Sequence, residues 1–332
     1  MSDQQTSTAL ERQIASQPEE LERLLFQPIP DETVERLRQA HRIWVVGTGT
    51  SQHAAELGAG MLHEAGRAAY AVSSMHFVNW APPIDPHDGV ILISHNAGTE
   101  TSYAAAAWAV ASKAGVRMVP ITRRDGAMPD AIQTVDKETS HTFTVSYTAV
   151  LLLLARLANE LGAETFDQGT LVRVPHAVRD AIADPGTTQI APPERLLVIT
   201  GEGPSSVSAR EGALKLREAS RFPAEGYDVE ALLHGHAVPL DARDHLVLLT
   251  PPDTDGLIDG VAAAATAEGV PVTRVHEPSD LPPVLAQIPL VVRLQLLALR
   301  FANERGFDPD LAIERAWADE GLWTIGSPAS GG

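Results

Sequence analysis

Three ionisable side chains recur at helical spacing in one short stretch of the sequence, namely Glu211, Lys215 and Glu218. At ~100° per residue, these positions fall on one side of a helix, within roughly 60° of one another. A carboxylate beside a lysine suits proton transfer next to a carbonyl group, because the first acts as base and the second stabilises an enediolate. The alternative is an exposed helix surface crossed by ion pairs. Lysine is otherwise found only at Lys113 and Lys137, which favours a specific role for Lys215.

A further candidate acid or base is His234, which is followed by a glycine and then by His236. Histidine changes its charge near neutral pH, so an exposed His234 could transfer protons. A capping or core histidine is the alternative. The His-x-His spacing is a weak indication of zinc, because no third ligand follows at the spacing of known zinc motifs. We therefore expect no metal here.

Three glycine-containing loops that follow apolar runs are candidates for holding a phosphate, at residues 47–51, 94–99 and 201–206. Ligands of open parallel sheets bind beyond the carboxyl ends of the strands, where helix N-termini supply N–H donors. The second loop is the most informative, because Ser94, Asn96 and Thr99 add side-chain donors. The same residue types also cap helices, which is the alternative. None of the loops matches a dinucleotide fingerprint or a Walker loop.

Short apolar runs alternate with helical patterns along the chain, which is typical of parallel sheets covered by helices on both faces. Seven runs predict strands, at residues 43–46, 69–72, 90–93, 116–122, 196–199, 246–249 and 271–275. The intervening patterns predict helices that end near residues 64 and 114 and that span 147–162, 208–220, 256–267 and 289–304. The order strand, glycine loop, helix occurs twice, about 150 residues apart, which indicates an internal duplication.

This organisation divides the chain into four parts. We predict an N-terminal helical segment at 1–40, a first domain with the phosphate loops at 41–165, a linker at 166–194 and a second domain with the acid–base helix at 195–332. The N-terminal segment is predicted to hold two helices broken at the prolines of residues 27–30, with Asp31 as N-cap of the second.

Composition narrows the possible partners. The 332 residues are 44% hydrophobic, which is enough for a globular core. A net charge of −18, from 43 acidic and 25 basic residues, repels nucleic acids and anionic membranes, so an anionic ligand must be held by local donors. The absence of cysteine excludes disulfides, thiolate metal sites and a cysteine nucleophile. No signal peptide or membrane span is recognised, so we expect a cytoplasmic protein.

Together these motifs resemble the sugar isomerase (SIS) domain superfamily, and within it the isomerase half of the glucosamine-6-phosphate synthases. The likeness is carried by the Gly-Thr-Ser sequence at 49–51, the loop at 94–99, the eight-residue motif at 211–218 and the His-Gly pair at 234–235. It extends over nearly the whole chain. It implies an α/β fold of two tandem SIS subdomains, each a doubly wound parallel sheet flanked by helices.

The resemblance also implies a hexose 6-phosphate derivative as substrate and a role for each matching residue. Six residues are implied to bind the 6-phosphate: Thr50, Ser51, Ser94, His95, Asn96 and Thr99. In the family pattern, Glu218 moves a proton between C1 and C2, while Lys215 and Glu211 position and polarise the substrate. His234 opens the sugar ring from the neighbouring subunit of a homodimer, and Glu138 is a further candidate near the C1–C2 end. No metal or cofactor is implied.

The sequence departs from the family pattern at several points. It contains no glutaminase domain and no N-terminal cysteine, so we expect no release of ammonia from glutamine. No lysine is present at residues 315–317, where the synthases use one for ring opening. His95 and Asn96 replace the usual glutamine and serine of the phosphate loop, and His236 replaces a proline.

We therefore predict an enzyme that acts on an amino-sugar or fructosamine 6-phosphate, as an aldose–ketose isomerase, a deaminase or a deglycase. Absence of the glutaminase half favours the direction toward ketose phosphate and free amine. The three activities share one type of proton transfer, so the sequence leaves them open. An alternative is a non-catalytic sugar-phosphate binding or regulatory protein on the same fold. An unrelated nucleotide-binding protein is disfavoured, because the glycine loops miss the required pattern.

Overall fold

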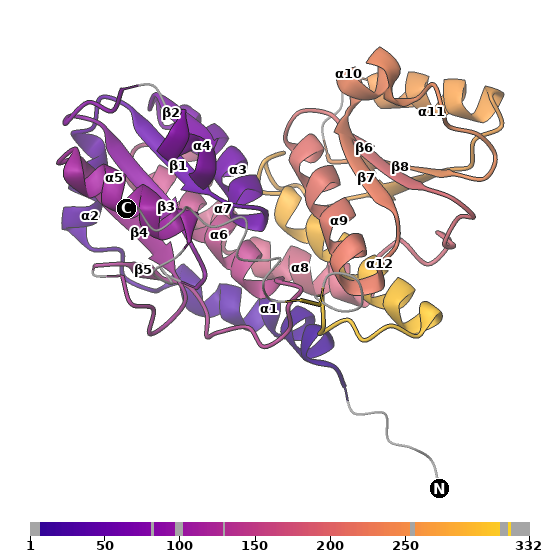
Figure 1. The fold of residues 1–332 in the computed structure, drawn as a ribbon, viewed down its shortest axis with the longest axis horizontal. Coiled ribbons are helices and arrows are strands. Elements are labelled where there is room, and N and C mark those ends of the chain that lie inside the picture. Colours follow the sequence, from indigo (N-terminus) through magenta and orange to yellow (C-terminus); the bar gives the residue numbers. More distant parts are fainter. Residues whose placement is uncertain are drawn as a thin grey trace, which may run out of the picture. The chain divides into compact units, whose positions relative to one another are not determined.

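The computed structural model describes residues 7–80, 83–96, 102–128, 130–252, 256–312 and 318–319. The chain divides into two compact units, each built around one parallel sheet (Figure 1). The first unit contains Glu20–Lys137 and Ser146–Arg173, and the second contains the described residues of Met1–Glu19, Glu138–Val145 and Val174–Ile313. Two features named above, Thr99 and residues 315–317, lie outside the described residues.

The first sheet has strand order β2-β1-β3-β4-β5, and all its strand pairs are parallel. Its strands are β1 (Ile43–Gly47), β2 (Ala69–Ser73), β3 (Gly89–Ile93), β4 (Arg117–Thr122) and β5 (Ile132–Gln133). Successive side chains of a strand point to opposite faces. Trp44 and Val46 of β1 thus reach one core, together with Phe77 and Ala107 from the helices that follow β2 and β3.

Helices connect these strands and cover the sheet (Figure 1). They are α2 (Asp31–Arg38), α3 (Thr50–Glu64), α4 (Ser74–Asn79), α5 (Tyr103–Lys113), the residues of α6 (Val145–Glu160) from 146 onward, the short 3₁₀ turn at Glu164–Phe166 and α7 (Gln168–Leu171). The first N-terminal helix, α1 (Ala9–Leu25), contributes residues to both units. α3 packs against β1 and β2, and its Gly58 lies so close to Leu154 of α6 that a Cβ would meet Cδ1 at 2.6 Å.

The second sheet has four parallel strands in the order β7-β6-β8-β9. Its strands are β6 (Leu197–Gly201), β7 (Ala224–Asp228), β8 (His245–Thr250) and β9 (Val272–His276). Its helices are α8 (Val174–Ala183), α9 (Pro204–Ser220), α10 (Val229–Ala231), the π-helical segment Leu232–His236, α11 (Leu257–Ala267) and α12 (Gln287–Arg305). α9 packs against β6, β7 and α12, and a Cβ on its Gly212 would meet Cδ1 of Leu294 in α12 at 2.4 Å.

The predicted α/β fold with two parallel sheets flanked by helices is confirmed, and so are the seven predicted strands, within two residues at each end. Two strands were not predicted. β5 has only two residues, and β7 is an edge strand that carries Glu225, Gly226 and Asp228 in place of an apolar run. The predicted break between the N-terminal helices is also confirmed.

The starts of α2 and α9 differ from the prediction for identifiable physical reasons. The N-cap of α2 is Pro30, and Asp31 is the first helical residue, where its charge still favours the positive end of the helix dipole. α9 begins at Pro204, four residues before the predicted start at 208, because proline is well suited to the first turn of a helix. The range 166–194, expected to be a linker, contains α7 and α8, and α8 packs against α12.

Among the described residues, no helix is both long and apolar enough to cross a bilayer.

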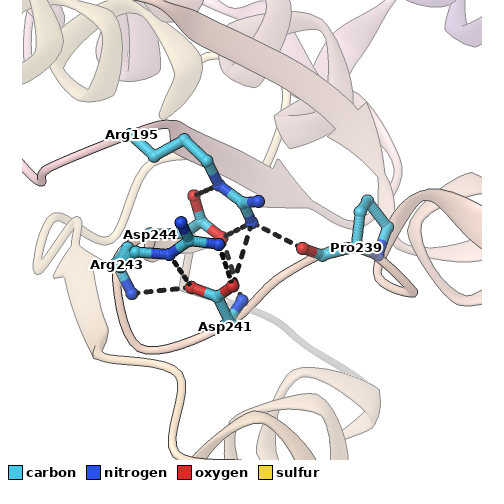
Figure 2. A network of polar contacts seen from close by, with 5 residues as sticks. All are labelled: Arg195, Pro239, Asp241, Arg243 and Asp244. Atoms are coloured by element: carbon cyan, nitrogen blue, oxygen red, sulfur yellow. Dashed lines mark hydrogen bonds and ion pairs between the residues drawn. The ribbon is translucent and has the colours of Figure 1, made fainter.

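At the amino end of the second sheet, the buried carboxylate of Asp244 forms hydrogen bonds with Arg195 (Figure 2). Arg195 precedes β6, and its Nε donates to Oδ1 of Asp244 across 2.8 Å, while its Nη2 donates to Oδ2 and to the carbonyl oxygen of Pro239. Asp241 accepts from Nη2 of Arg243 at 2.7 Å. The hydrogen bond from Arg195 is the main cause that holds the pKa of Asp244 below its usual value. Since ligands of such sheets bind at the carboxyl ends of the strands, this cluster is structural.

The first unit repeats this arrangement at the amino end of its own sheet. Nε of Arg42 donates to Oδ1 of Asp88 across 3.0 Å, and its Nη2 donates to Oδ2 across 2.8 Å and to the Pro83 carbonyl across 3.3 Å. The same contacts, made by residues at the same places relative to the strands, are what an internal duplication predicts. The two units can therefore be compared position by position.

Candidate functional site

The glycine turn after β1 places two of the expected phosphate ligands at the start of a helix. Gly49 adopts φ 57° and ψ −125°, which favours glycine, and the next two residues, Thr50 and Ser51, begin α3. A Cβ on Gly47 would lie 2.3 Å from the Ser51 carbonyl oxygen, so this turn also needs a glycine at Gly47. The positive end of the α3 dipole therefore coincides with two hydroxyl groups, an arrangement that suits an anion.

The second candidate loop begins at the end of the neighbouring strand. β1 and β3 are paired in parallel, so Ser94, His95 and Asn96 lie at the same sheet edge as the start of α3. The Ser94 amide donates to the Ile121 carbonyl at 3.0 Å, and Thr122 Oγ1 donates to the His95 carbonyl at 3.3 Å. These bonds fix the loop to β4. The predicted phosphate ligands that are described therefore share one edge of the first sheet.

His95 is held in its neutral form. Burial, followed by the positive charges of Arg123 and Lys137, lowers the pKa of His95 to about 4. At neutral pH its imidazole can exchange hydrogen bonds with a ligand but adds no positive charge. An anion bound at this edge must therefore be neutralised by other groups.

The acid–base helix is buried where it carries its charges. Glu211 and Lys215 of α9 have no exposed side-chain surface, and the side chain of Glu218 is 25% exposed. Lys215 Nζ lies 3.3 Å from Oε1 of Glu211 and donates to Oε2 of Glu218 across 2.6 Å. The alternative of an exposed, ion-paired helix surface is therefore wrong. The structure brings these three predicted residues together.

Lys215 remains an ammonium at neutral pH. Burial by itself lowers the pKa of Lys215, but attraction to Glu211 and Glu218 and the hydrogen bonds to both outweigh burial and raise it. Lys215 is thus a fixed cation rather than a base. The partly exposed Glu218 is the member of the cluster with access to a ligand.

Comparison with α3 shows that the fold does not require this charged pair. Gly203 before α9 has φ 50° and ψ −125°, nearly the values of Gly49 before α3. Gly212 and Gly58 each lie nine residues further on, and both pack against a leucine of the closing helix.

This alignment pairs Glu211 with Leu57 and Lys215 with Met61, since each stands at the same distance from the aligned glycine. Leu57 and Met61 are buried in the first unit, at 2% and 0% exposure. An apolar pair therefore fills these helix positions in one unit and an ion pair fills them in the other. Because burying charges is costly, the ion pair points to a function rather than to stability.

His234 lies in the π-helical segment that follows β7 and is exposed. Its Nδ1 is 2.8 Å from the Glu230 carbonyl oxygen, which can only accept, so Nδ1 carries a proton and, in the neutral tautomer, the lone pair is on Nε2. Gly235 has φ 124°, a value that favours glycine, and lets the chain turn directly after His234. His234 is therefore exposed, as the candidate role requires, and the hydrogen bond to Glu230 fixes the orientation of its ring. His236 stacks on Tyr227, with ring centroids 4.1 Å apart.

Glu138 lies outside α9 and is buried. Its Oε2 accepts from the amide of Thr144 at 2.9 Å and from the Thr144 hydroxyl at 3.2 Å. These bonds close the loop between residues 138 and 144. The contacts give Glu138 a structural part in its own segment.

In the third candidate loop, after β6, the side chain of Glu202 already forms a hydrogen bond within the protein. Oε1 of Glu202 accepts from the amide of Ile258 in α11 at 2.9 Å. Pro204 begins α9 without an N–H group, and Ser205 is buried and accepts from Nε2 of Gln287 at 3.1 Å. Unlike the loops of the first unit, this one does not present the donors that a phosphate needs.

Sequence reasoning missed two basic residues close to the candidate loop that contains His95, namely Arg123 and Lys137. Arg123 directly follows β4, the strand next to β3. The rule that ligands bind beyond the carboxyl ends of strands would have identified it, had the strand order been known. Lys137 follows β5 by four residues, and its proximity to His95 emerges only from the fold.

Comparison with protein families and curated sequences finds similarity to SIS domains and to isomerizing glutamine–fructose-6-phosphate aminotransferases. Residues 36–160 match the family model described as SIS domain. Over 333 aligned residues the chain is 26% identical to an isomerizing glutamine–fructose-6-phosphate aminotransferase of Pyrococcus horikoshii, covering 90% of this chain and 55% of that protein. The chain spans about half the length of the curated relatives it matches.

Solved structures share the fold over nearly the whole chain. A glucosamine-6-phosphate deaminase from Thermotoga maritima aligns with a TM-score of 0.76 and 19% identity, over 91% of this chain and 97% of that one. A tagatose-6-phosphate ketose/aldose isomerase from Escherichia coli aligns with a TM-score of 0.77 and 20% identity, over 94% and 96%. At these identities the likeness shows the fold alone.

Proposed function

We propose that this chain, a SIS-domain protein that resembles the isomerase half of the aminotransferases named above, is a phosphosugar isomerase or deaminase. Its substrate would be an amino-sugar or fructosamine 6-phosphate. The observation that carries the proposal is the buried Glu211–Lys215 pair beside Glu218, at helix positions where the other unit has Leu57 and Met61. The names of the relatives support the same class of substrate.

The 6-phosphate would be held at the carboxyl edge of the first sheet. The proposed ligands are Thr50, Ser51, Ser94, His95, Asn96 and Thr99. The helix dipole of α3 and the hydroxyl donors support this assignment. A phosphate held there fixes one end of an open-chain sugar, so that the reacting carbons are presented in one orientation.

Proton transfer would be carried out by Glu218. Its carboxylate takes the proton from one of the two carbons C1 and C2, which leaves an enediolate or enaminol, and returns a proton to the other. Lys215 remains charged and stabilises the negative oxygen of the intermediate, and Glu211 keeps Lys215 in place. For a 2-amino-sugar phosphate, transfer of the proton from C2 to C1 gives an imine at C2, which water hydrolyses to a ketose phosphate and ammonia. For a fructosamine phosphate, transfer from C1 to C2 gives an imine at C1, which water hydrolyses to an aldose phosphate and a free amine.

Ring opening would use His234. Because Nδ1 donates to the Glu230 carbonyl, the neutral ring would present the lone pair of Nε2 as a base. We propose that His234 completes the site of a neighbouring subunit in a homodimer, and that Glu138 is a further residue near the C1–C2 end. This route needs no lysine near the C-terminus.

The test is a screen of amino-sugar 6-phosphates and fructosyl-amine 6-phosphates in D₂O, with mass spectrometry of the products. The expected products are a ketose phosphate and ammonia from an amino-sugar 6-phosphate, or an aldose phosphate and a free amine from a fructosyl-amine 6-phosphate, in either case with deuterium at the carbon that received the proton. Glu218→Gln should reduce turnover by about 10²–10⁴-fold while thermal shift still detects ligand binding. Glu64→Gln is the matched control, because Glu64 stands on α3 where Glu218 stands on α9. Binding without turnover across the whole panel would favour the regulatory alternative, and full activity of Glu218→Gln would remove this residue from the mechanism.

A further inference from the structure

Three neighbouring strands of the first sheet end on the same side and lead into the segments that carry His95, Arg123 and Lys137. β3, β4 and β5 are consecutive in the strand order, with Ile93 paired to Ile121 and Ile121 to Ile132. Beyond β4, the Arg124 amide donates to the Val135 carbonyl at 2.8 Å, which continues the contact past the ends of the strands. His95, Arg123 and Lys137 therefore belong to one edge.

The two adjacent arginines after β4 have different surroundings. Arg124 Nε lies 3.1 Å from Oδ1 of Asp136, and its Nη2 lies 3.5 Å from Oε2 of Glu20, so its charge is balanced within the protein. Arg123 forms no ion pair among the described residues; its Nη1 donates only to the Arg124 carbonyl, at 3.4 Å, and its buried Nε has no hydrogen-bond partner there. Arg123 is therefore a cation without a balancing carboxylate in the described part of the chain.

Lys137 adds a second positive charge on the same side. Its side chain is exposed, and like Arg123 it acts electrostatically on His95. Two such cations beside one loop are unusual in a chain with 43 acidic and 25 basic residues. A phosphate monoester carries nearly two negative charges at neutral pH. The hydroxyl groups and the neutral His95 of this loop supply hydrogen bonds but no full charge.

We propose that Arg123 and Lys137 bind the phosphoryl group of the substrate, as the charged part of the site formed by Ser94, His95 and Asn96. Arg123 is suited to a pair of hydrogen bonds to phosphate oxygens, and Lys137 to a mobile point charge at the rim. This inference rests on the proposed function, because it assigns further ligands to the same phosphate. It explains how a chain of net charge −18 attracts an anion.

The test measures binding of inorganic phosphate, fructose 6-phosphate and unphosphorylated fructose by titration calorimetry. Arg123→Gln and Lys137→Gln should each weaken phosphate and fructose 6-phosphate binding by about tenfold or more, and should reduce its dependence on salt. Arg124→Gln is the matched control and should leave binding within about twofold, because its charge is already balanced by carboxylates. Affinity for unphosphorylated fructose should be unchanged throughout.

A second measurement separates loss of charge from loss of fold. NMR titration should show that the pKa of His95 rises in Arg123→Gln and stays low in Arg124→Gln. Because Lys137 is exposed, Lys137→Gln should leave the fold unchanged. Wild-type affinity in both Arg123→Gln and Lys137→Gln would overturn this inference and leave the proposed function standing. A wild-type protein that binds neither phosphate nor fructose 6-phosphate would overturn both.

Discussion

Lys215 donates a hydrogen bond to Oε2 of Glu218 across 2.6 Å, from a side chain that is itself fully buried in α9. The buried end of this pair is neutralised by Glu211, while Glu218 remains partly exposed. A charge sealed inside the protein thus acts on a carboxylate that a ligand can reach. In the first unit, the aligned positions of Glu211 and Lys215 in α3 hold the buried residues Leu57 and Met61, so this ion-paired cluster has no counterpart there.

Exchange of the charged pair for its apolar counterparts should separate stability from activity. In Glu211→Leu/Lys215→Met the helix positions hold the residues found in α3, so the free energy of unfolding should be unchanged or rise by about 1–4 kcal/mol. Turnover should be lost, because Glu218 no longer has its cation. Lys215→Met alone leaves Glu211 buried without its partner and should destabilise by about 3–5 kcal/mol. Denaturant unfolding and product formation check both; a double variant that unfolds, or that stays active, contradicts the assignment.

His95 should not titrate in the range where a surface histidine does. Its pKa in the folded protein is about 4, against an ordinary value of 6.5. The folded state therefore binds fewer protons than the unfolded chain below pH 6.5, so the contribution of His95 to stability is present above pH 6.5 and decreases as the pH falls toward 4. Stability curves of wild type and His95→Gln should converge or cross over this interval. An NMR midpoint near 6.5 for His95 would contradict it.

Asp244 and Asp88 should be important for stability and unimportant for catalysis. Both are buried at the amino ends of their sheets and hydrogen-bonded by arginines. Asp244→Asn should lower the free energy of unfolding at pH 7 by about 1.5–3 kcal/mol, because a charge-assisted hydrogen bond is lost. The pKa of Asp244 is lowered, so its stabilisation is present above the usual aspartate value of 3.8 and disappears as the pH falls further. Turnover per folded molecule should equal that of wild type, and Asp88→Asn should behave alike; a selective loss of activity would place this cluster in the site.

Much of the fold followed from the sequence because buried parallel strands are continuous apolar runs. β7 was not predicted, because it is an edge strand with Gly226 at its centre. A Cβ at this position would meet the Ala209 carbonyl oxygen at 2.4 Å. The glycine is required by the close packing of α9, but in the sequence it reads as a turn. Because the packing of α9 requires this glycine, the residues of β7 do not form the apolar pattern from which a strand is recognised.

The sequence predicted the residue types of the candidate site, but it did not predict that their side chains are buried. The spacing of Glu211, Lys215 and Glu218 places them on one side of a helix whether that side faces solvent or core. Only the packing of α9 against β6, β7 and α12 decides between these outcomes. Arg123 was not identified from the sequence for a similar reason, since its place beside His95 depends on the order of β3 and β4 in the sheet.

Mixing two inactive variants should test whether His234 serves a neighbouring subunit. His234→Ala and Glu218→Gln should each be inactive as homodimers. If His234 completes the partner's site, a mixed dimer has one intact site, made of Glu218 from one chain and His234 from the other. Random mixing by co-expression should then restore about one quarter of wild-type turnover, since half of the dimers are mixed and half of their sites are intact. Mixing Glu218→Gln with Lys215→Met is the matched control and should restore nothing, because each site takes both residues from the same chain and every site of the mixed dimer therefore still carries one of the two changes. No recovery with His234→Ala would limit the histidine to its own subunit and leave proton transfer by Glu218 unaffected.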